Sequence, residues 1–310
     1  MPELPEVTTT VKGLNEVLPH LTITDVWSDY FVNTKSVAKN TIKNKKFFES
    51  FKKEVVGEKF LSAERRGKNI LIHLSNNKTI LIHMKMTGHL LYGVYKKSKI
   101  KNENGKLAQQ QIWTSEEEKL KDPFNQFIHF TLSLSNGKTL AFSDMRKFAK
   151  VTLFETSTRD SHIDLKNLGP EPLSHFTPAH LTTQLSKKPR GLIKSVLMDQ
   201  TVVAGVGNIY SDEILWMSGI HPERRVDTLT SSEIKKIFNS MIEVLESGIE
   251  LGGDSMSDYR NIYGERGDFQ NSHKAYRRTK QACLKKGCSG TIERKIIGSR
   301  SAHFCNTHQK

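Results

Sequence analysis

The sequence predicts an α+β protein in which a strand-rich part is followed by a helical part and a short cysteine-containing end. The first half holds strand-like apolar runs, with hairpin signals at Asn76-Asn77 and Asn136-Gly137. The second half holds apolar residues at helical spacing. All three cysteines lie between residues 283 and 305. With 310 residues, the chain is long enough for two domains or more.

The predicted elements follow in order along the chain. An amphipathic helix comes first, because apolar residues recur at helical spacing at Leu4, Val7, Val11, Leu14 and Leu18. An antiparallel sandwich or flattened barrel follows, with strands predicted at 69–74, 79–84, 127–134, 138–142 and 148–154. Helices are then predicted at 178–186, 189–199, 208–217 and 231–250, and Gly252-Gly253 ends the last of them.

Composition shifts divide the chain. We predict a first domain at 1–156, a linker at 157–168, a helical domain at 169–253 and a terminal segment at 254–310. Two stretches of the first domain are predicted to be insertions or mobile loops. Residues 33–53 are rich in Lys and Asn, and residues 96–123 are charged and show no clear periodicity.

The charge balance predicts a polyanionic partner. Lys and Arg number 47 against 33 Asp and Glu, which gives a net charge of +14 and a pI near 9.5. This excess favours nucleic acid over a membrane surface. It is steepest at 260–310, where 12 basic and 3 acidic residues give +9. No apolar run approaches the roughly 18 residues of a membrane span, and the start has no apolar signal-peptide core. We therefore expect a cytoplasmic protein.

The start of the chain holds a candidate nucleophile. Removal of Met1 is favoured before a small residue, and it would leave Pro2 with a free secondary amine. An α-amino group has a pKa of about 7.7–8.0, so a sizeable unprotonated fraction can attack a carbonyl carbon and form an iminium. Glu3 could shuttle protons beside it. The same residues also suit an ordinary helix start, because proline and acids are favoured in a first turn.

Residues 204–213 form a glycine-containing turn between two apolar helices. Asn208 is placed to N-cap the second helix, and Gly205 and Gly207 allow an unusual turn before it. Open backbone amides at a helix start bind phosphate. An ordinary capped helix–turn–helix is the alternative interpretation.

Other candidate residues have plausible structural interpretations when they are taken alone. Lys68 opens a strand after two arginines and a glycine, which also suits a solvated basic turn. Phe148 follows a strand and is flanked by charge, as a strand-edge phenylalanine would be. Met86 follows two strand-like runs and would otherwise be assigned to the core.

The terminal cysteines predict a metal site. The pattern Cys283-x4-Cys288-x16-Cys305-x2-His308 places short spacings on both sides of a hairpin-length segment. Such spacing suits a tetrahedral zinc ion in a reducing compartment. His303 and His273 are competing fourth ligands.

Several motifs in the correct order give the chain a family resemblance. Residues 2–7, residues 169–222 with Met198-Asp199-Gln200 and Gly207-Asn208-Ile209-Tyr210, and residues 300–305 carry it. The chain resembles the formamidopyrimidine-DNA glycosylase family of bifunctional base-excision repair enzymes over nearly its whole length, excluding 96–123. The resemblance implies an N-terminal helix with an antiparallel β-sandwich, a helix–two-turn–helix domain and a β-hairpin zinc finger with one structural Zn²⁺.

The resemblance also implies roles for the candidate residues. Pro2 would attack C1′ of the damaged nucleotide, and Glu3 would protonate the deoxyribose ring oxygen. Glu6 would support the terminal helix. The residues that would hold phosphates next to the lesion are Lys68, Asn208 and Arg300. The residues that would fill the gap left by the extruded base are Met86, Arg146 and Phe148, with Arg146 facing the orphaned cytosine.

The implied partner is damaged double-stranded DNA, and the implied state is a monomer. Residues 254–275, including Ser255 and Tyr259, would form the loop over the flipped base. The implied reaction removes oxidised purines and then cleaves the strand by β,δ-elimination. Two narrower alternatives are an endonuclease VIII-like enzyme for oxidised pyrimidines, whose opening usually carries Gly-Pro where Leu4-Pro5 stands here, and a non-catalytic damaged-DNA binder.

Two features depart from the family pattern. The family usually has Cys-x2-Cys at both ends of the zinc finger, whereas the first spacing here is four and the last ligand is His308. Residues 96–123 are also longer than the family needs.

Overall fold

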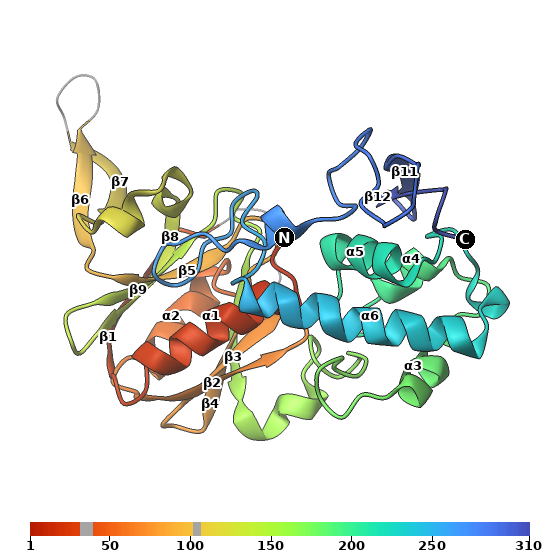
Figure 1. Ribbon diagram of the computed structural model, residues 1–310. Helices are drawn as coiled ribbons and strands as arrows, with labels where there is room; N and C mark the ends of the chain where they lie inside the picture. Colours follow the sequence, from red (N-terminus) through yellow and green to blue (C-terminus); the bar gives the residue numbers. More distant parts are fainter. Residues whose placement is uncertain (32–39, 102–106) are drawn as a thin grey trace.

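The computed structural model describes residues 1–31, 40–101 and 107–310, and it has a strand-rich half and a helical half (Figure 1). Helix α1 (Leu4–Val17) belongs to both halves. Its Leu4 lies in the core of the helical half, whereas Val7, Val11 and Leu14 lie in the core of the strand-rich half. The helix predicted from apolar spacing therefore joins the two cores.

The strand-rich half is an antiparallel sandwich, as predicted. One sheet has the order β1 (Ile23–Ser28), β8 (Ile128–Leu134), β9 (Thr139–Ser143) and β5 (His89–Gly93). The other has the order β10 (Lys150–Glu155), β4 (Lys78–His83), β3 (Asn69–Leu74) and β2 (Phe60–Arg66). Side chains alternate across β3, so Ile70 and Ile72 enter the core between the sheets while Leu71 packs outside with Leu165.

The two predicted loop segments contain regular structure, which corrects the prediction. Helix α2 (Lys45–Val55) begins inside the first segment and ends two residues beyond it, and its start is capped because Asn44 Oδ1 accepts from the Phe47 amide at 3.0 Å. Its apolar face is buried at Phe48, Phe51 and Val55. Residues 33–39 of that prediction lie outside the described residues.

The second predicted loop contains an antiparallel ribbon of β6 (Lys96–Lys101) and β7 (Leu107–Thr114), which projects from one end of the sandwich (Figure 1). Trp113 of β7 packs against Trp27 of β1, and the Lys97 ammonium lies over both rings. Two 3₁₀ turns follow, at Glu118–Lys121 and Pro123–Gln126. Residues 102–106 lie outside the described residues.

The helical half contains α3 (Pro178–Leu185), α4 (Ile193–Leu197), α5 (Asn208–Ser218) and α6 (Ser231–Glu250). The first, third and fourth match the predicted ranges closely, whereas α4 is shorter than the predicted 189–199. Helix α6 begins with a capping box, in which Thr230 Oγ1 accepts from the Glu233 amide and the Glu233 carboxylate accepts from the Thr230 amide.

The chain ends in a hairpin of β11 (Glu293–Ile297) and β12 (Arg300–Phe304), which lies above α4 and α5 in Figure 1. Further 3₁₀ turns occur at Thr156–Ser161, Val226–Thr228 and Phe269–Ser272. None of the helices in the described ranges is both long and apolar enough to cross a membrane.

Candidate active site

The start of α1 lies at the junction of the two halves, where Figure 1 marks the N-terminus. Pro2 is buried and Met1 is exposed. The adjacent Glu3 side chain is 2% exposed, and its carboxylate accepts from the Ile209 amide at 3.1 Å and the Tyr210 amide at 3.4 Å. These amides open helix α5, whose N-terminal end attracts negative charge. A buried carboxylate is therefore fixed beside Pro2 by an element 200 residues away in sequence.

Two glycines make this contact possible. A β-carbon at Gly207 would lie 2.4 Å from Glu3 Oε1, and one at Gly205 would lie 2.8 Å from the Leu4 side chain. Gly205 also has a φ of +98°, and its carbonyl accepts from the Leu4 amide at 3.1 Å. The glycine-containing turn thus lets the backbone of α5 approach the start of α1.

Glu6 is the second buried carboxyl group at this end of the helix. It accepts from the Tyr210 hydroxyl at 2.6 Å and from the amides of Asp254 and Glu3 at 2.7 Å each. Burial raises the pKa of the Glu6 carboxyl to about 7, and the nearby Glu3 charge adds to the shift. The donors act in the opposite direction. Glu6 therefore connects α1, α5 and the residues that follow α6.

Lys68 is a buried cation on which the charges of these carboxylates act. Its side chain is 6% exposed, and within the described part of the chain its ammonium has no hydrogen-bond or ion-pair partner. Burial lowers the pKa of the Lys68 ammonium, while the charges of Glu3 and Glu6 raise it and that of Arg300 lowers it. The site therefore holds a buried cation whose hydrogen-bond capacity is free for an anionic ligand.

The turn that presents Lys68 is fixed by Glu171. Its carboxylate accepts from the Arg65 guanidinium at 2.5 Å, from that of Arg66 at 3.0 Å and from the Gly67 amide at 2.6 Å. The two arginines are thus paired and partly buried, and the solvated basic turn considered as an alternative is wrong.

Asn208 is the first residue of α5, and Gly207 occupies the N-cap, so the predicted cap was misplaced by one residue. The Asn208 side-chain oxygen is buried without a hydrogen-bond partner among the residues described here. A buried polar group normally has a hydrogen-bond partner, so this Asn208 oxygen suggests that a polar ligand binds at the start of α5.

Arg300 approaches the same region from the hairpin. It opens β12 with an exposed side chain, after the turn residues Gly298 (φ +54°) and Ser299 (φ +62°). Its positive charge lowers the pKa of the Lys68 ammonium, so the two cations act on each other electrostatically.

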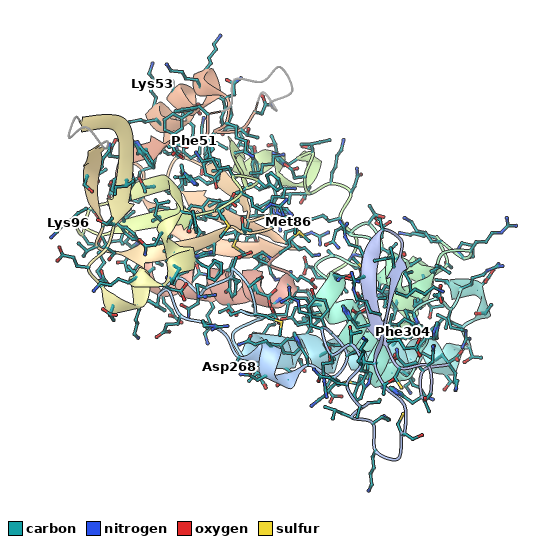
Figure 2. The ribbon with its side chains drawn as sticks, turned by 90° about the horizontal axis from the view of Figure 1, so that it is seen from above. Phe51, Lys53, Met86, Lys96, Asp268 and Phe304 are labelled. Carbon is teal, nitrogen blue, oxygen red and sulfur yellow. The ribbon has the colours of Figure 1, made fainter. Side chains whose placement is uncertain are left out.

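Met86, Arg146 and Phe148 lie on loops at the edge of the sandwich. Met86 is 42% and Phe148 48% exposed, and the Arg146 guanidinium lies 4.4 Å from the centre of the Phe148 ring. Figure 2 shows Met86 at the junction of the two halves. A side chain with this exposure is not part of a core, so the core assignment considered for Met86 is wrong.

Asp144 joins the two loops. It is fully buried, and its carboxylate accepts from the hydroxyls of Thr87 and Tyr30 and from the amides of Arg146 and Ala149. Thr87 follows Met86 in the chain, so one carboxylate fixes both loops.

Tyr259 is buried against helix α1. Its side chain is 4% exposed, and its hydroxyl donates to the Glu6 carbonyl at 2.9 Å and contacts Thr10 at 3.3 Å. Burial raises the pKa of this hydroxyl. Packing beneath α1 has taken this aromatic ring away from the surface, so Tyr259 supports the helix and this placement gives no support for a direct contact with DNA.

The predicted metal ligands come together. The ligand atoms of Cys283, Cys288, Cys305 and His308 all lie within 4.8 Å of one another. His308 Nε2 is 3.0 Å from the Trp216 carbonyl oxygen, which leaves Nδ1 facing Cys283 Sγ at 3.2 Å. That arrangement fixes the imidazole tautomer as a metal ligand requires. Three thiols and one imidazole suit tetrahedral zinc.

The competing histidines lie elsewhere. His303 Nδ1 is 2.9 Å from Asp212 Oδ2, and His273 Nε2 is 2.8 Å from Asp254 Oδ2. Asp212 also pairs at 2.6 Å with Lys194, and both side chains are nearly inaccessible. Lys194 donates further to Ser211 Oγ at 2.9 Å.

The sequence interpretation assigned no role to this ion pair. It links α4, α5 and β12, and an isolated lysine within the apolar pattern of α4 was the available signal. Glu213 was likewise missed, although it accepts from the three successive amides of residues 274–276 and so anchors the path to the hairpin beside the Cys3His cluster.

Comparison with known families identifies both halves. The model of the formamidopyrimidine-DNA glycosylase N-terminal domain matches residues 1–151, and that of the formamidopyrimidine-DNA glycosylase H2TH domain matches residues 168–260. The formamidopyrimidine-DNA glycosylase of Pelotomaculum thermopropionicum is 35% identical over 311 residues, which cover 100% of this chain and 99% of the relative.

Solved structures show the same fold. The complex of Lactococcus lactis Fpg with DNA containing an abasic site has a TM-score of 0.79 and 28% identity and covers 99% of both chains. The complex of MutM with DNA containing carbocyclic 8-oxo-G has a TM-score of 0.79 and 29% identity and covers 100% of both chains.

Proposed function

This chain belongs to the formamidopyrimidine-DNA glycosylase family, and we propose that it removes oxidised purines from duplex DNA and then cleaves the strand at the abasic site. The proposed substrates are 8-oxoguanine opposite cytosine and formamidopyrimidines. One observation carries the proposal: the buried Glu3 carboxylate is fixed beside Pro2, and its charge acts on the buried Lys68, which has no hydrogen-bond partner among the residues that the structure describes. The similarity to MutM, which was solved with 8-oxo-G-containing DNA, supports the purine substrate.

The reaction begins at Pro2 once Met1 has been removed. Its secondary amine attacks C1′ of the damaged nucleotide while Glu3 protonates the deoxyribose ring oxygen. A bond from nitrogen to C1′ forms, the bond from C1′ to the base breaks, and the base leaves with the proton that the amine gives up. The protonated ring oxygen then leaves C1′, which opens the sugar ring and gives the iminium. Glu3 suits this role because the amides of Ile209 and Tyr210 hold its carboxylate in place.

Strand cleavage follows from the iminium at C1′. The iminium acidifies the 2′ position, so loss of a 2′ proton expels the 3′ phosphate by β-elimination. A further proton loss expels the 5′ phosphate by δ-elimination, and hydrolysis of the imine then releases Pro2. The similarity to Lactococcus lactis Fpg, which was solved with an abasic site, supports the proposal that this nucleotide binds here.

Phosphates next to the lesion are proposed to bind Lys68, Arg300 and Asn208. A phosphate would supply a partner for the Lys68 ammonium, which has none within the described ranges, and it would favour the charged form that burial disfavours. Zinc bound to the Cys3His cluster would fasten the hairpin that carries Arg300. Four protein ligands leave no position for a reactive water, so its role is structural.

Extrusion of the base leaves a gap in the duplex. Unstacking costs a few kcal/mol, and an apolar wedge that enters the gap offsets this cost. Met86, Phe148 and Arg146 suit this role because they are presented together on loops held by Asp144. The Arg146 guanidinium would donate to the acceptors of the orphaned cytosine.

The relatives and solved structures described above favour neither narrower alternative, the enzyme for oxidised pyrimidines or the non-catalytic binder. We propose that the protein acts as a monomer in the cytoplasm, where its positive charge favours association with the nucleoid.

Borohydride trapping tests the proposal directly. The protein is incubated with a duplex that carries 8-oxoguanine opposite cytosine, with borohydride present, and the adduct is mapped by peptide analysis. An adduct on Pro2 is expected, and Glu3→Gln is expected to suppress base removal while lesion binding persists. An adduct on a lysine, or none with active protein, would contradict the mechanism.

A further inference from the structure

The segment that follows α6 passes over the start of α1. The Asp254 amide donates to Glu6 Oε1 at 2.7 Å, and the Tyr259 hydroxyl donates to the Glu6 carbonyl at 2.9 Å. Burial raises the pKa of the Asp258 carboxyl, while the charges of the amino terminus and Arg146 lower it. Residues 254–259 therefore pack against the start of α1 through Glu6.

Arg260 joins this segment to Asp122 through hydrogen bonds. Its side chain is 2% exposed, and its Nε and Nη2 atoms donate to Asp122 Oδ2 at 3.0 and 2.9 Å. Its Nη1 atom donates to the carbonyls of Ser257 and Tyr259 at 3.1 and 2.8 Å. The guanidinium also lies 5.1 Å from the centre of the Phe124 ring. One buried cation thus sets the backbone path of residues 257–260.

The surface that contacts this segment is formed by residues 118–126, which overlap the end of the predicted 96–123 stretch. The Asn125 side-chain amide donates to the Gly264 carbonyl at 3.4 Å, and Lys119 pairs with Glu265 at 2.6 Å in an exposed position. A buried guanidinium is stable only when its donors have acceptors. Loss of the Asp122–Arg260 ion pair would therefore release residues 254–259.

We propose that Arg260 is a positioning residue for base excision, because its pairing with Asp122 holds residues 254–259 over the start of α1 before DNA binds. This inference rests on the proposed function and adds a residue to it. A base drawn out of the duplex toward Pro2 would meet an already ordered surface, so binding would not have to order that segment. An abasic nucleotide has no base to place there, so its cleavage would not depend on Arg260.

Conservative variants separate positioning from folding. Arg260→Lys keeps the charge but loses the forked donors, and Asp122→Asn keeps the shape and can still accept from the Phe124 amide at the start of the second 3₁₀ turn. Lys119→Ala is the matched control, because it breaks an exposed ion pair between the same two segments. Each protein is tested in single-turnover base excision from an 8-oxoguanine:cytosine duplex and in cleavage of a preformed abasic duplex.

Arg260→Lys and Asp122→Asn are expected to slow excision by about tenfold to a hundredfold, with abasic cleavage within about twofold of the unchanged protein. Lys119→Ala is expected to leave both rates unchanged. Equal slowing of the two reactions, or no slowing of excision, would overturn the inference. Failure of the proposed function has a different signature, because the unchanged protein would then perform neither reaction.

Hydrogen exchange provides a readout that requires no substrate and remains informative if one variant folds poorly. The backbone amides of residues 257–266 are expected to exchange about tenfold faster in Asp122→Asn, while those of the sandwich core are unchanged. Unchanged exchange at 257–266 would show that the ion pair does not hold the segment and would overturn the inference.

Discussion

The carboxylate of Glu3 fills the space that a β-carbon of residue 207 would need. An added Cβ at Gly207 would lie 2.3 Å from Glu3 Cδ and 2.4 and 2.6 Å from its two oxygens. Gly207 has an extended backbone (φ −134°, ψ −152°) that other residues adopt readily. The glycine is therefore required by the approach of Glu3 and not by its own conformation.

Gly207→Ala is expected to displace the Glu3 carboxylate and slow base excision by about tenfold to a hundredfold, since a shift of about 1 Å at a catalytic group has this effect. The measurement is single-turnover excision, with thermal unfolding as the check on folding. An unchanged excision rate in a folded variant would show that Glu3 need not lie against α5.

Glu6 is expected to make stability depend on pH. Because burial raises its pKa from 4.5 to about 7, the folded protein holds this proton to higher pH than the unfolded chain. The contribution of Glu6 to the free energy of unfolding should therefore fall as the pH rises between these two pKa values and level off above the higher one. The total fall should be on the order of 3 kcal/mol.

Chemical denaturation between about pH 4.5 and 8 measures this effect. Glu6→Gln cannot titrate and should show a flatter profile, whereas Glu49→Gln, at an exposed position of α2, should follow the unchanged protein. Parallel profiles for Glu6→Gln and the unchanged protein would contradict the prediction.

Freshly purified protein is expected to contain about one zinc ion per chain. His308→Ala should lose the metal, since its Nδ1 atom faces the thiols, and His303→Ala should retain it, since His303 contacts Asp212. Metal analysis and thermal unfolding with and without chelator are the measurements. Retention by His308→Ala together with loss by His303→Ala would show that the fourth ligand is misassigned.

Binding to lesion-containing duplex is expected to weaken with salt. Lys68→Ala and Arg300→Ala should each reduce the slope of log affinity against log salt by about 0.9, since each removes one cationic phosphate contact. Asn208→Ala removes a neutral contact and should lower affinity with little change in slope. Titrations at several salt concentrations test this, and unchanged affinity in all three variants would rule out the proposed placement of DNA.

Truncation of the stacked pair at the sandwich edge is expected to impair base extrusion. Phe148→Ala should slow excision from a duplex more than cleavage of a single-stranded abasic substrate, where no gap must be filled. Arg146→Ala should also weaken the preference for cytosine opposite 8-oxoguanine. Single-turnover rates with each opposite base are the measurement. Two results together would contradict this prediction. Phe148→Ala would slow the duplex and single-strand reactions equally, and Arg146→Ala would leave the ratio of rates with different opposite bases unchanged.

Local patterns in the sequence were enough for the fold class and for much of its content. Apolar spacing predicted α1 and most of the helical half, because one face of each helix meets a core. Alternation and turn residues predicted β3, β4, β8, β9 and β10. Strands β1, β2 and β5 were missed. Strands β1 and β2 carry irregular pairing and mixed burial that weaken the alternating signal. Strand β5 is buried at every position and so shows no alternation.

The sequence by itself also determined which residue types could form the metal cluster, because thiols and imidazoles at hairpin spacing have few other uses. Only the tertiary structure decided that His308, and not His303, completes the set, because Asp212 already holds His303. It likewise decided that Tyr259 is buried, that Glu171 anchors the turn before Lys68, and that Asp122 meets Arg260. Such pairings join residues far apart in sequence, and their energies depend on burial and exact distance, which no local spacing encodes.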